Sequence, residues 1–222
     1  GNVDKASSAF KRTTELNPNF ADGYNNLGAS LHNQGMLKES LLAYNKAISL
    51  RPDYVEAYSN LGVLLQENGK IKEAIECYKK AISIKPDYAE AHNNIGNAFR
   101  DQGKFKEAIG AYNRAISIKP DYAEAYCHMG IALNDQGKLK DAIEAYKNAT
   151  NYKLTYVEAW TNGAEALEKW NKLDQLEGWL IQAFKSFKVI PSDIVYLQSK
   201  LLWRNKKFQK AFDLISTIND EN

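Results

Sequence analysis

The stretch that decides the fold reads PDYVEAYSNLGVLLQENG and runs from Pro52 to Gly69. Near-copies of this stretch recur along the chain at a constant spacing of 34 residues. The residues that mark the period are Pro18, Pro52, Pro86 and Pro120; Gly28, Gly62, Gly96 and Gly130; Gly35, Gly69, Gly103 and Gly137; and Tyr44, Tyr78, Tyr112 and Tyr146. A fixed period of this length is typical of folds in which one supersecondary unit is repeated and stacked.

One period, residues 55–88, predicts two amphipathic helices. In its first half, Tyr58 and Leu65 lie two helical turns apart and therefore on one face. Gly69 follows, where a left-handed glycine can end a helix at little cost. The second apolar run must end before Pro86, because proline disfavours the helical conformation of the residue before it. Each period is therefore predicted to be an antiparallel hairpin of two helices, each about 21 Å long.

An acidic residue near the start of each predicted first helix has two interpretations. Asp53 can accept from the first free N–H groups, and Glu56 can reach back to it, which together form a capping box. Alternatively, the acidic row could attract a basic peptide. The row consists of Asp22, Glu56, Glu90, Glu124 and Glu158, three residues after Asn19, Asp53, Asp87, Asp121 and Thr155. Capping explains the row without a ligand and is the interpretation that we favour.

The pattern within one period resembles that of the tetratricopeptide repeat family. The residues that carry the resemblance are Tyr58, Leu61, Gly62, Leu65, Gly69, Ala74, Tyr78, Ala81 and Pro86. The resemblance implies an all-α, right-handed superhelical solenoid of antiparallel helix hairpins with a period of 34 residues. It also implies that the first helix of each hairpin faces the concave side.

The period divides the chain into units, which we expect to form a single solenoid domain over residues 1–222. Residues 4–20 match the second half of a repeat, which suggests an excerpt of a longer polypeptide. Regular repeats are expected at 21–54, 55–88, 89–122 and 123–156. Residues 157–190 and 192–222 are degenerate repeats that cap the stack or lead into a further domain. The last of these matches the repeat pattern only at Leu202, Phe208, Ala211 and Ile215.

Composition narrows the class of partner. The 29 basic and 27 acidic residues give a net charge of +2, which offers no reason to expect binding to nucleic acid or to an anionic membrane. No apolar run approaches the length of a membrane span, and no signal peptide is visible. Cys77 and Cys127 lie in different repeats and are predicted to be free thiols in a reducing compartment. We therefore expect a cytoplasmic location.

One polar position on the first helices recurs with the period and is the main candidate for ligand binding. It is occupied by Asn26, Asn60, Asn94, His128 and Asn162. This series resembles the asparagine ladder in the repeats of O-linked N-acetylglucosamine transferase. The resemblance implies that the amides hydrogen-bond the main chain of an extended peptide, a role suited to a group with two donors and one acceptor. The alternative is that these asparagines brace neighbouring helices.

The most polar first helix is expected in the repeat 89–122. The residues predicted to share one face are Asn93, Asn94, Asn97, Arg100 and Asp101. Asn93, Asn97 and Arg100 are our candidates for the centre of specificity, and a solvated polar face is the alternative.

The sequence contains no recognisable motif of a catalytic or metal-binding site. The three histidines do not combine with Cys, Asp or Glu in a metal-binding motif, and no nucleophile–base pair can be drawn. We expect no cofactor and no enzymatic activity in this chain, and a scaffold that binds a protein or an extended peptide. Two alternatives stay open. The chain could recruit substrates within a larger glycosyltransferase or sulfotransferase, or it could self-associate through residues 157–222.

Three tryptophans in the degenerate part bear on self-association. They are Trp170, Trp179 and Trp203. They are predicted to fill the core of a repeat in which small residues of the regular pattern are replaced by larger ones. Alternatively, they form an apolar surface that meets a following domain or a second copy of the chain.

Overall fold

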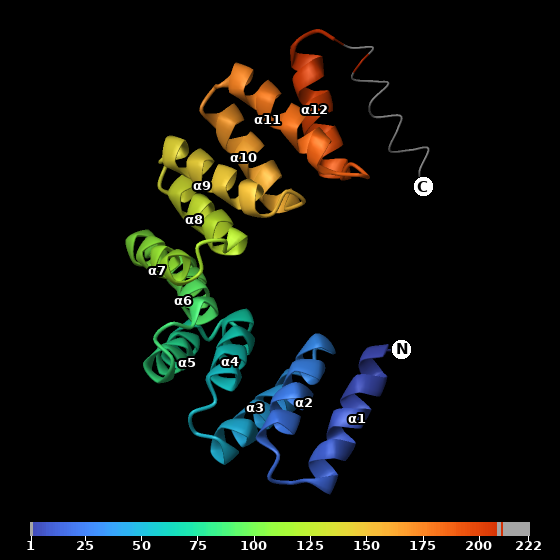
Figure 1. Ribbon diagram of the computed structural model, residues 1–222, viewed down its shortest axis with the longest axis vertical. Coiled ribbons are helices and arrows are strands. Elements are labelled where there is room, and N and C mark those ends of the chain that lie inside the picture. Colours follow the sequence, from blue (N-terminus) through green and yellow to red (C-terminus); the bar gives the residue numbers. More distant parts are fainter. Residues whose placement is uncertain (1, 208–209, 211–222) are drawn as a thin grey trace. The chain divides into compact units, whose positions relative to one another are not determined.

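The computed structural model describes residues 2–207 and 210, and within these ranges every regular element is an α-helix. Figure 1 shows the helices in chain order. They are α1 (Asn2–Leu16), α2 (Ala21–Asn33), α3 (Leu37–Leu50), α4 (Val55–Glu67), α5 (Ile71–Ile84), α6 (Ala89–Asp101), α7 (Phe105–Ile118), α8 (Ala123–Asp135), α9 (Leu139–Tyr152), α10 (Val157–Lys169), α11 (Leu173–Ser186) and α12 (Ser192–Arg204). The predicted all-α repeat fold is confirmed.

The helix boundaries follow the sequence period. The first helices α2, α4, α6, α8 and α10 begin 34 residues apart, and so do the second helices α3, α5, α7, α9 and α11. Helix α12, which is the first helix of the last repeat, begins 35 residues after α10. This shift of one residue fixes which residues of α10 and α12 occupy equivalent places. Phe208, Ala211 and Ile215, named above for the last repeat, lie outside the described residues.

The chain divides into two compact units, residues 1–118 and 119–222. In the first unit, α1 packs on α2, and the hairpins α2/α3, α4/α5 and α6/α7 follow one another. The first helices of adjacent repeats also touch, α2 on α4 and α4 on α6. In the second unit, α8/α9 and α10/α11 form hairpins, and α12 packs on α10 and α11. In both units, consecutive first helices therefore lie side by side.

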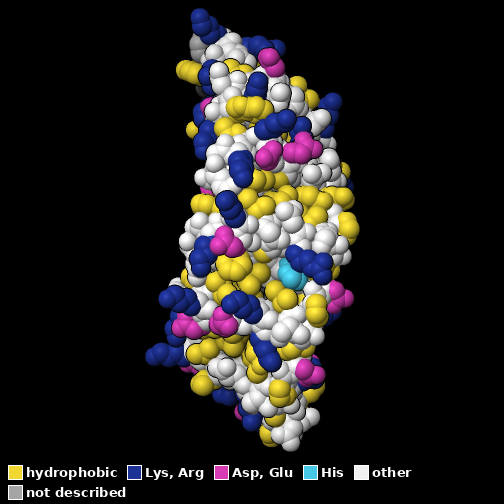
Figure 2. All heavy atoms as spheres, turned by 90° about the vertical axis from the view of Figure 1, so that its left-hand side faces the viewer, with side chains coloured by type: hydrophobic (Ala, Val, Ile, Leu, Met, Phe, Trp, Pro, Cys, Tyr) yellow, Lys and Arg dark blue, Asp and Glu magenta, His cyan; other side chains and the backbone are white. Residues whose placement is uncertain are grey.

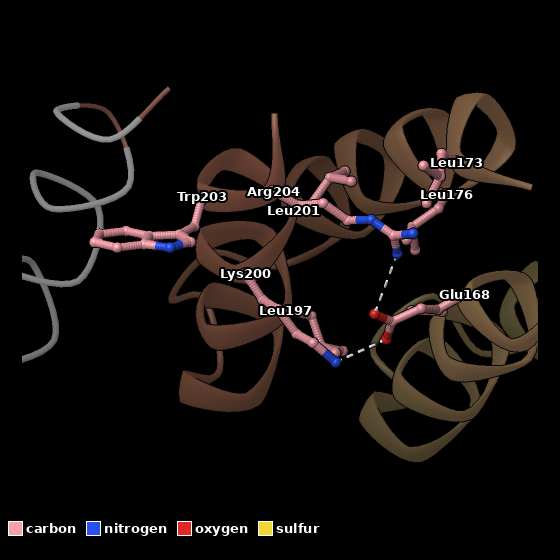
Figure 3. A pocket seen from close by; sticks show the side chains of 9 residues that line it. Glu168, Leu173, Leu176, Leu197, Lys200, Leu201, Trp203 and Arg204 are labelled. Atoms are coloured by element: carbon pink, nitrogen blue, oxygen red, sulfur yellow. Dashed lines mark hydrogen bonds and ion pairs between the residues drawn. The ribbon is translucent and has the colours of Figure 1, made fainter. Parts of the chain in front are cut away.

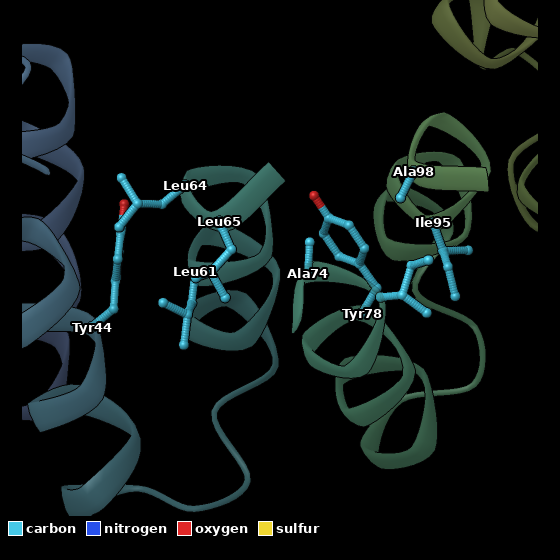
Figure 4. Packing of buried hydrophobic residues seen from close by; sticks show 9 residues of the cluster. Tyr44, Leu61, Leu64, Leu65, Ala74, Tyr78, Ile95 and Ala98 are labelled. Carbon is cyan, nitrogen blue, oxygen red and sulfur yellow. The ribbon is translucent and has the colours of Figure 1, made fainter. Parts of the chain in front are cut away.

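A glycine and a tyrosine set the packing inside each regular hairpin. Tyr112 is fully buried, and a Cβ placed on Gly96 would lie only 2.6 Å from its ring. Figure 4 shows the equivalent Tyr78 between Ala74 and the aliphatic residues of the next repeat, including Ile95. Because each ring fills the space that a glycine leaves, the two helices of a hairpin approach closely.

In the degenerate repeat, Trp179 takes the place of the tyrosine. It is 5% exposed and lies against Gly163, as the regular tyrosines lie against their glycines. Its Nε1 donates to the main-chain oxygen of Trp160 at 2.8 Å, and the two indoles meet edge to face with centroids 4.7 Å apart. The predicted core role is therefore confirmed for Trp179. Trp170 and Trp203 are exposed, at 36% and 62%.

The turns behave as predicted, whereas the helix starts do not. Gly69 has a positive φ of 73°, and Asn171 takes the same conformation, with φ 58°, in the degenerate repeat. The predicted capping box at Asp53 is wrong, because the N-cap of α4 is Tyr54, whose side chain makes no capping hydrogen bond. Asp53 therefore lies one residue too early to cap the helix. Tyr54 is buried and packs with residues of the hairpin that precedes α4, such as Ala47.

Candidate functional site

The asparagine series lies on the first helices as predicted. In the first unit, Asn26 on α2 is exposed, and Asn60 on α4 and Asn94 on α6 are half-buried. Because α2 touches α4 and α4 touches α6, the three amides stand on consecutive, neighbouring helices. In the second unit, His128 on α8 and Asn162 on α10 are also half-buried.

These amides hold adjacent repeats together. The Nδ2 group of Asn60 donates to Oδ1 of Asn25 at 3.1 Å, and Nδ2 of Asn94 donates to Oγ of Ser59 at 3.3 Å. In the second unit, the side chain of Asn162 lies next to that of Cys127 and lowers the pKa of the thiol slightly, against the larger opposite effect of burial. In all three pairs the partners are 35 residues apart, so each amide reaches back one repeat. Such a bond uses only part of the hydrogen-bonding capacity of a carboxamide, which has two N–H donors and an acceptor oxygen.

Two of the three proposed specificity residues serve the scaffold. Asn93 is only 4% exposed, and its Nδ2 donates to Oδ1 of Asn94 at 3.4 Å. Asn97 is half-buried and its Oδ1 accepts from the hydroxyl of Tyr112 at 2.8 Å. The expectation that Asn93 belongs to an open surface is therefore wrong. It occupies the same place in its repeat as Asn25 and Ser59, which are also buried.

Arg100 and Asp101 form the charged edge of α6. Their closest charged atoms, Nη2 and Oδ1, are 3.7 Å apart, and Asp101 is exposed. Asp101 also accepts from Nε2 of Gln66 on α4 at 2.6 Å. The hydroxyl of Tyr78 in turn donates to Oε1 of Gln66 at 3.1 Å. These contacts fix the polar edge of α6 relative to α4.

A second set of contacts between repeats was not anticipated from the sequence. His32 and Glu67 meet at 2.7 Å, in the same relation as Gln66 and Asp101. Both pairs are 35 residues apart and lie near the ends of first helices. A search for complementary polar residues at this separation, one more than the period, would have found them.

The acidic row stabilises repeats by a route other than capping. Asp22 accepts from Arg51 at 2.7 and 3.0 Å and from the hydroxyl of Tyr54 at 2.7 Å. These hydrogen bonds, chiefly that from Arg51, hold the pKa of Asp22 below its ordinary value. In the second unit, Glu124 pairs with Lys153 at 2.7 Å, also 29 residues away. Asp22 and Glu124 therefore each tie a first helix to the residue that follows the second helix of the same hairpin, whereas Glu158 accepts from the hydroxyl of Tyr156.

Two common kinds of reactive site, a metal cluster and an ionised thiol, are absent from the described residues. None of them forms a group of three or more His, Cys, Asp or Glu that could hold a metal ion. Burial raises the pKa of Cys77 to about 11 and that of Cys127 to about 12, so both thiols stay protonated near neutral pH. On the face shown in Figure 2, basic and acidic side chains are interspersed among hydrophobic ones. None of the described helices has the length and apolar character needed to cross a membrane.

Family comparisons identify the repeats. A model described as TPR repeat matches residues 30–69, 65–100 and 96–137, and two models described as Tetratricopeptide repeat match residues 9–41 and 123–156. Together they span about two thirds of the chain. The chain belongs to the tetratricopeptide repeat family. No curated protein sequence matches it.

Several solved structures share the tetratricopeptide fold of this chain. The MamA protein is 26% identical, with a TM-score of 0.64, and the match covers 77% of this chain and 98% of MamA. PilF from Pseudomonas aeruginosa is 18% identical, with a TM-score of 0.72 over 98% of this chain and 90% of PilF. YrrB, described as a TPR protein with an unusual peptide-binding site, is 22% identical, with a TM-score of 0.59 over 82% of this chain and 93% of YrrB.

Proposed function

We propose that this chain is a non-catalytic scaffold that binds an extended segment of another protein across its first helices. The observation that carries the proposal is the series of carboxamides on neighbouring helices, Asn26, Asn60 and Asn94. The side chain of Asn26 is exposed and makes no hydrogen bond to another described side chain, while those of Asn60 and Asn94 are held in place by one bond each to the preceding repeat. Side chains fixed before binding lose little conformational freedom when a ligand arrives.

The spacing of the helices suits an extended ligand. Packed helices lie about 8–10 Å apart, and an extended chain rises about 3.3 Å per residue. One repeat therefore corresponds to about three residues of peptide. A carboxamide can donate to a peptide carbonyl and accept from a peptide N–H, whatever the side chain of the ligand is. The series would recognise the main chain, and neighbouring charged residues such as Arg100 and Asp101 would select among sequences.

A selection from displayed random linear peptides tests this role. Peptides enriched on the wild-type chain are then titrated against Asn26→Ala and Asn60→Ala. Each loss should weaken binding about tenfold, as expected for a well-placed hydrogen bond in a desolvated site. Asn26→Ala is the sharper variant, because Asn60 also contacts Asn25.

Matched controls are Asn45→Ala and Asn113→Ala, which remove exposed asparagines from the second helices α3 and α7. These should bind like the wild type, and all four variants should keep the helical circular dichroism spectrum. Binding that survives both first-helix substitutions would sink the proposed role of the series, and an absence of any enriched peptide would sink the function itself.

A second candidate function is self-association through the degenerate repeats. Large apolar side chains of this region are exposed, among them Ile181 at 46%, Val189 at 71% and Tyr196 at 63%. Exposed apolar residues of this kind can mark a protein interface. Sedimentation equilibrium over a wide range of concentrations tests it. A mass that rises with concentration in the wild type, and not in Val189→Asp/Tyr196→Asp, is the expected result, and a constant monomer mass would exclude it.

A further inference from the structure

We infer that a pocket between α10, α11 and α12 takes a large apolar side chain from an acidic peptide segment. The inference rests on the function proposed above and names the chemistry of the ligand at one end of the chain. Figure 3 shows the pocket, with Leu173 and Leu176 from α11 on one side and Leu197 and Leu201 from α12 on the other.

The floor of the pocket is apolar and its size suits one side chain. Besides these leucines, Ala164 of α10 contributes to the lining. Leu176 and Leu201 are buried, at 5% and 4% exposure, so the floor is fixed by the core. The volume is about 310 Å³, at the lower end of the range of about 300–1,000 Å³ that is usual for ligand pockets. It therefore has room for one aromatic or long aliphatic side chain of a ligand.

The rim supplies the charge selection. Nζ of Lys200 lies 2.8 Å from Glu168, and an Nη of Arg204 lies 3.8 Å from the other oxygen of the same carboxylate (Figure 3). Two cations therefore share this carboxylate, and Glu165, three residues earlier on α10, adds a weaker electrostatic attraction on Lys200. The side chains of Lys200 and Arg204 are 50% and 49% exposed, whereas that of Glu168 is 29% exposed. An acidic side chain of a ligand can therefore reach both cations from the solvent.

Two further basic residues lie close to the end of α12 in the sequence. Lys206 and Lys207 follow the helix after one intervening residue, Asn205, and both are exposed. The hydrogen bond to Glu168 raises the pKa of Lys200, which keeps its ammonium group charged. The rim is therefore complementary to an acidic partner.

The position of the pocket relates it to the asparagine series. Since α12 begins 35 residues after α10, Leu197 occupies the place on α12 that Asn162 occupies on α10. In the degenerate repeat an apolar residue thus replaces the amide, and the cations of Lys200 and Arg204 flank it. Recognition by main-chain hydrogen bonds would give way here to recognition of one apolar side chain and its acidic neighbours.

The peptide selection described above also tests this inference. Peptides enriched on the wild-type chain should contain a Phe, Leu, Trp or Met flanked by Asp or Glu. Lys200→Gln/Arg204→Gln should weaken such peptides about tenfold or more, because charge-assisted hydrogen bonds are lost. Glu168→Gln should strengthen them about threefold, because the internal competitor for the cations is removed. The matched control is Lys80→Gln/Arg114→Gln, which removes the same charges from exposed positions on α5 and α7.

The outcomes separate the two proposals. Peptides that lack the acidic and apolar signature, or whose affinity is the same for the Lys200/Arg204 variant and the control, would overturn the pocket while leaving a peptide scaffold standing. Peptides that respond to the pocket variants and not to Asn26→Ala would support the pocket and remove the asparagine series. If the two cations only neutralise the end of α12, the variant will lower the thermal midpoint and leave affinity unchanged, which also overturns the inference.

Discussion

Two alanine substitutions in one hairpin should shift stability in opposite directions. A Cβ on Gly96 would lie 2.6, 2.8 and 3.0 Å from three ring atoms of Tyr112, whereas non-bonded carbons prefer about 3.5–4.0 Å. The ring would have to move by about 1 Å. It has no space to do so, because Tyr112 is fully buried and its hydroxyl is bonded to Asn97. Gly110, on α7, has no atom within 4 Å of the same hypothetical Cβ.

The magnitudes follow from these environments. Overpacking against a fixed ring costs about 3 kcal/mol of stability. The higher helix propensity of alanine, compared with glycine, offsets about 1 kcal/mol of this cost. Gly96→Ala should therefore lose about 2 kcal/mol. Gly110→Ala meets no obstacle and should gain about 0.5–1 kcal/mol.

Urea titration followed by far-ultraviolet circular dichroism measures both effects. With a slope of about 2 kcal/mol per molar urea, Gly96→Ala should lower the midpoint by about 1 M. Gly110→Ala should raise it by a few tenths of that amount. Midpoints are compared, because repeat arrays can unfold in more than one step. A midpoint for Gly96→Ala at or above that of the wild type would show that the tyrosine does not require the glycine.

Three further substitutions test other contacts. Asp22→Asn should lower the urea midpoint at neutral pH and flatten the dependence of that midpoint on pH in acid. The ionised carboxylate stabilises the fold above its ordinary pKa of 3.8, and this contribution is lost as the pH falls through the folded-state pKa, which Arg51 lowers. Equal acid profiles for the variant and the wild type would contradict this prediction. Lys206→Gly should raise the thermal midpoint, since the φ of 60° at this residue costs a residue with a side chain about 1 kcal/mol, and an unchanged midpoint would argue against strain there. Trp179→Phe should cost about 2 kcal/mol in urea titrations, because it removes buried volume and the bond to Trp160; an unchanged urea midpoint would contradict this.

The sequence was sufficient for the helices, because each period carries its own information. The apolar spacing around Tyr58 and the glycine at position 69 act within one hairpin, and the structure places α4 and α5 accordingly. The helix starts were less predictable. Asp53 is a favourable capping residue in isolation, but burial of Tyr54 against the hairpin that precedes α4 determines where α4 begins.

The candidate site was predictable in position and not in its contacts. Periodicity placed Asn60 and Asn94 on equivalent faces of α4 and α6. Whether Asn93 faces solvent depends on the tertiary packing around α6, which the spacing of residues within one helix does not determine. The pairing of Gln66 with Asp101 has the same origin. The period alone cannot reveal it, because the partners are one residue out of phase.

The equivalence of the helix starts has a consequence for how the length of such a chain can change. The backbone at Tyr54 has φ −80° and ψ 90°, and at Tyr88 it has φ −86° and ψ 91°. Deleting residues 55–88 would therefore join two chain ends that already have the same direction and conformation. Asn94 would then face Asn25, as Asn60 does now. In-register recombination between the coding repeats could thus shorten or extend the array by whole hairpins without creating a foreign junction.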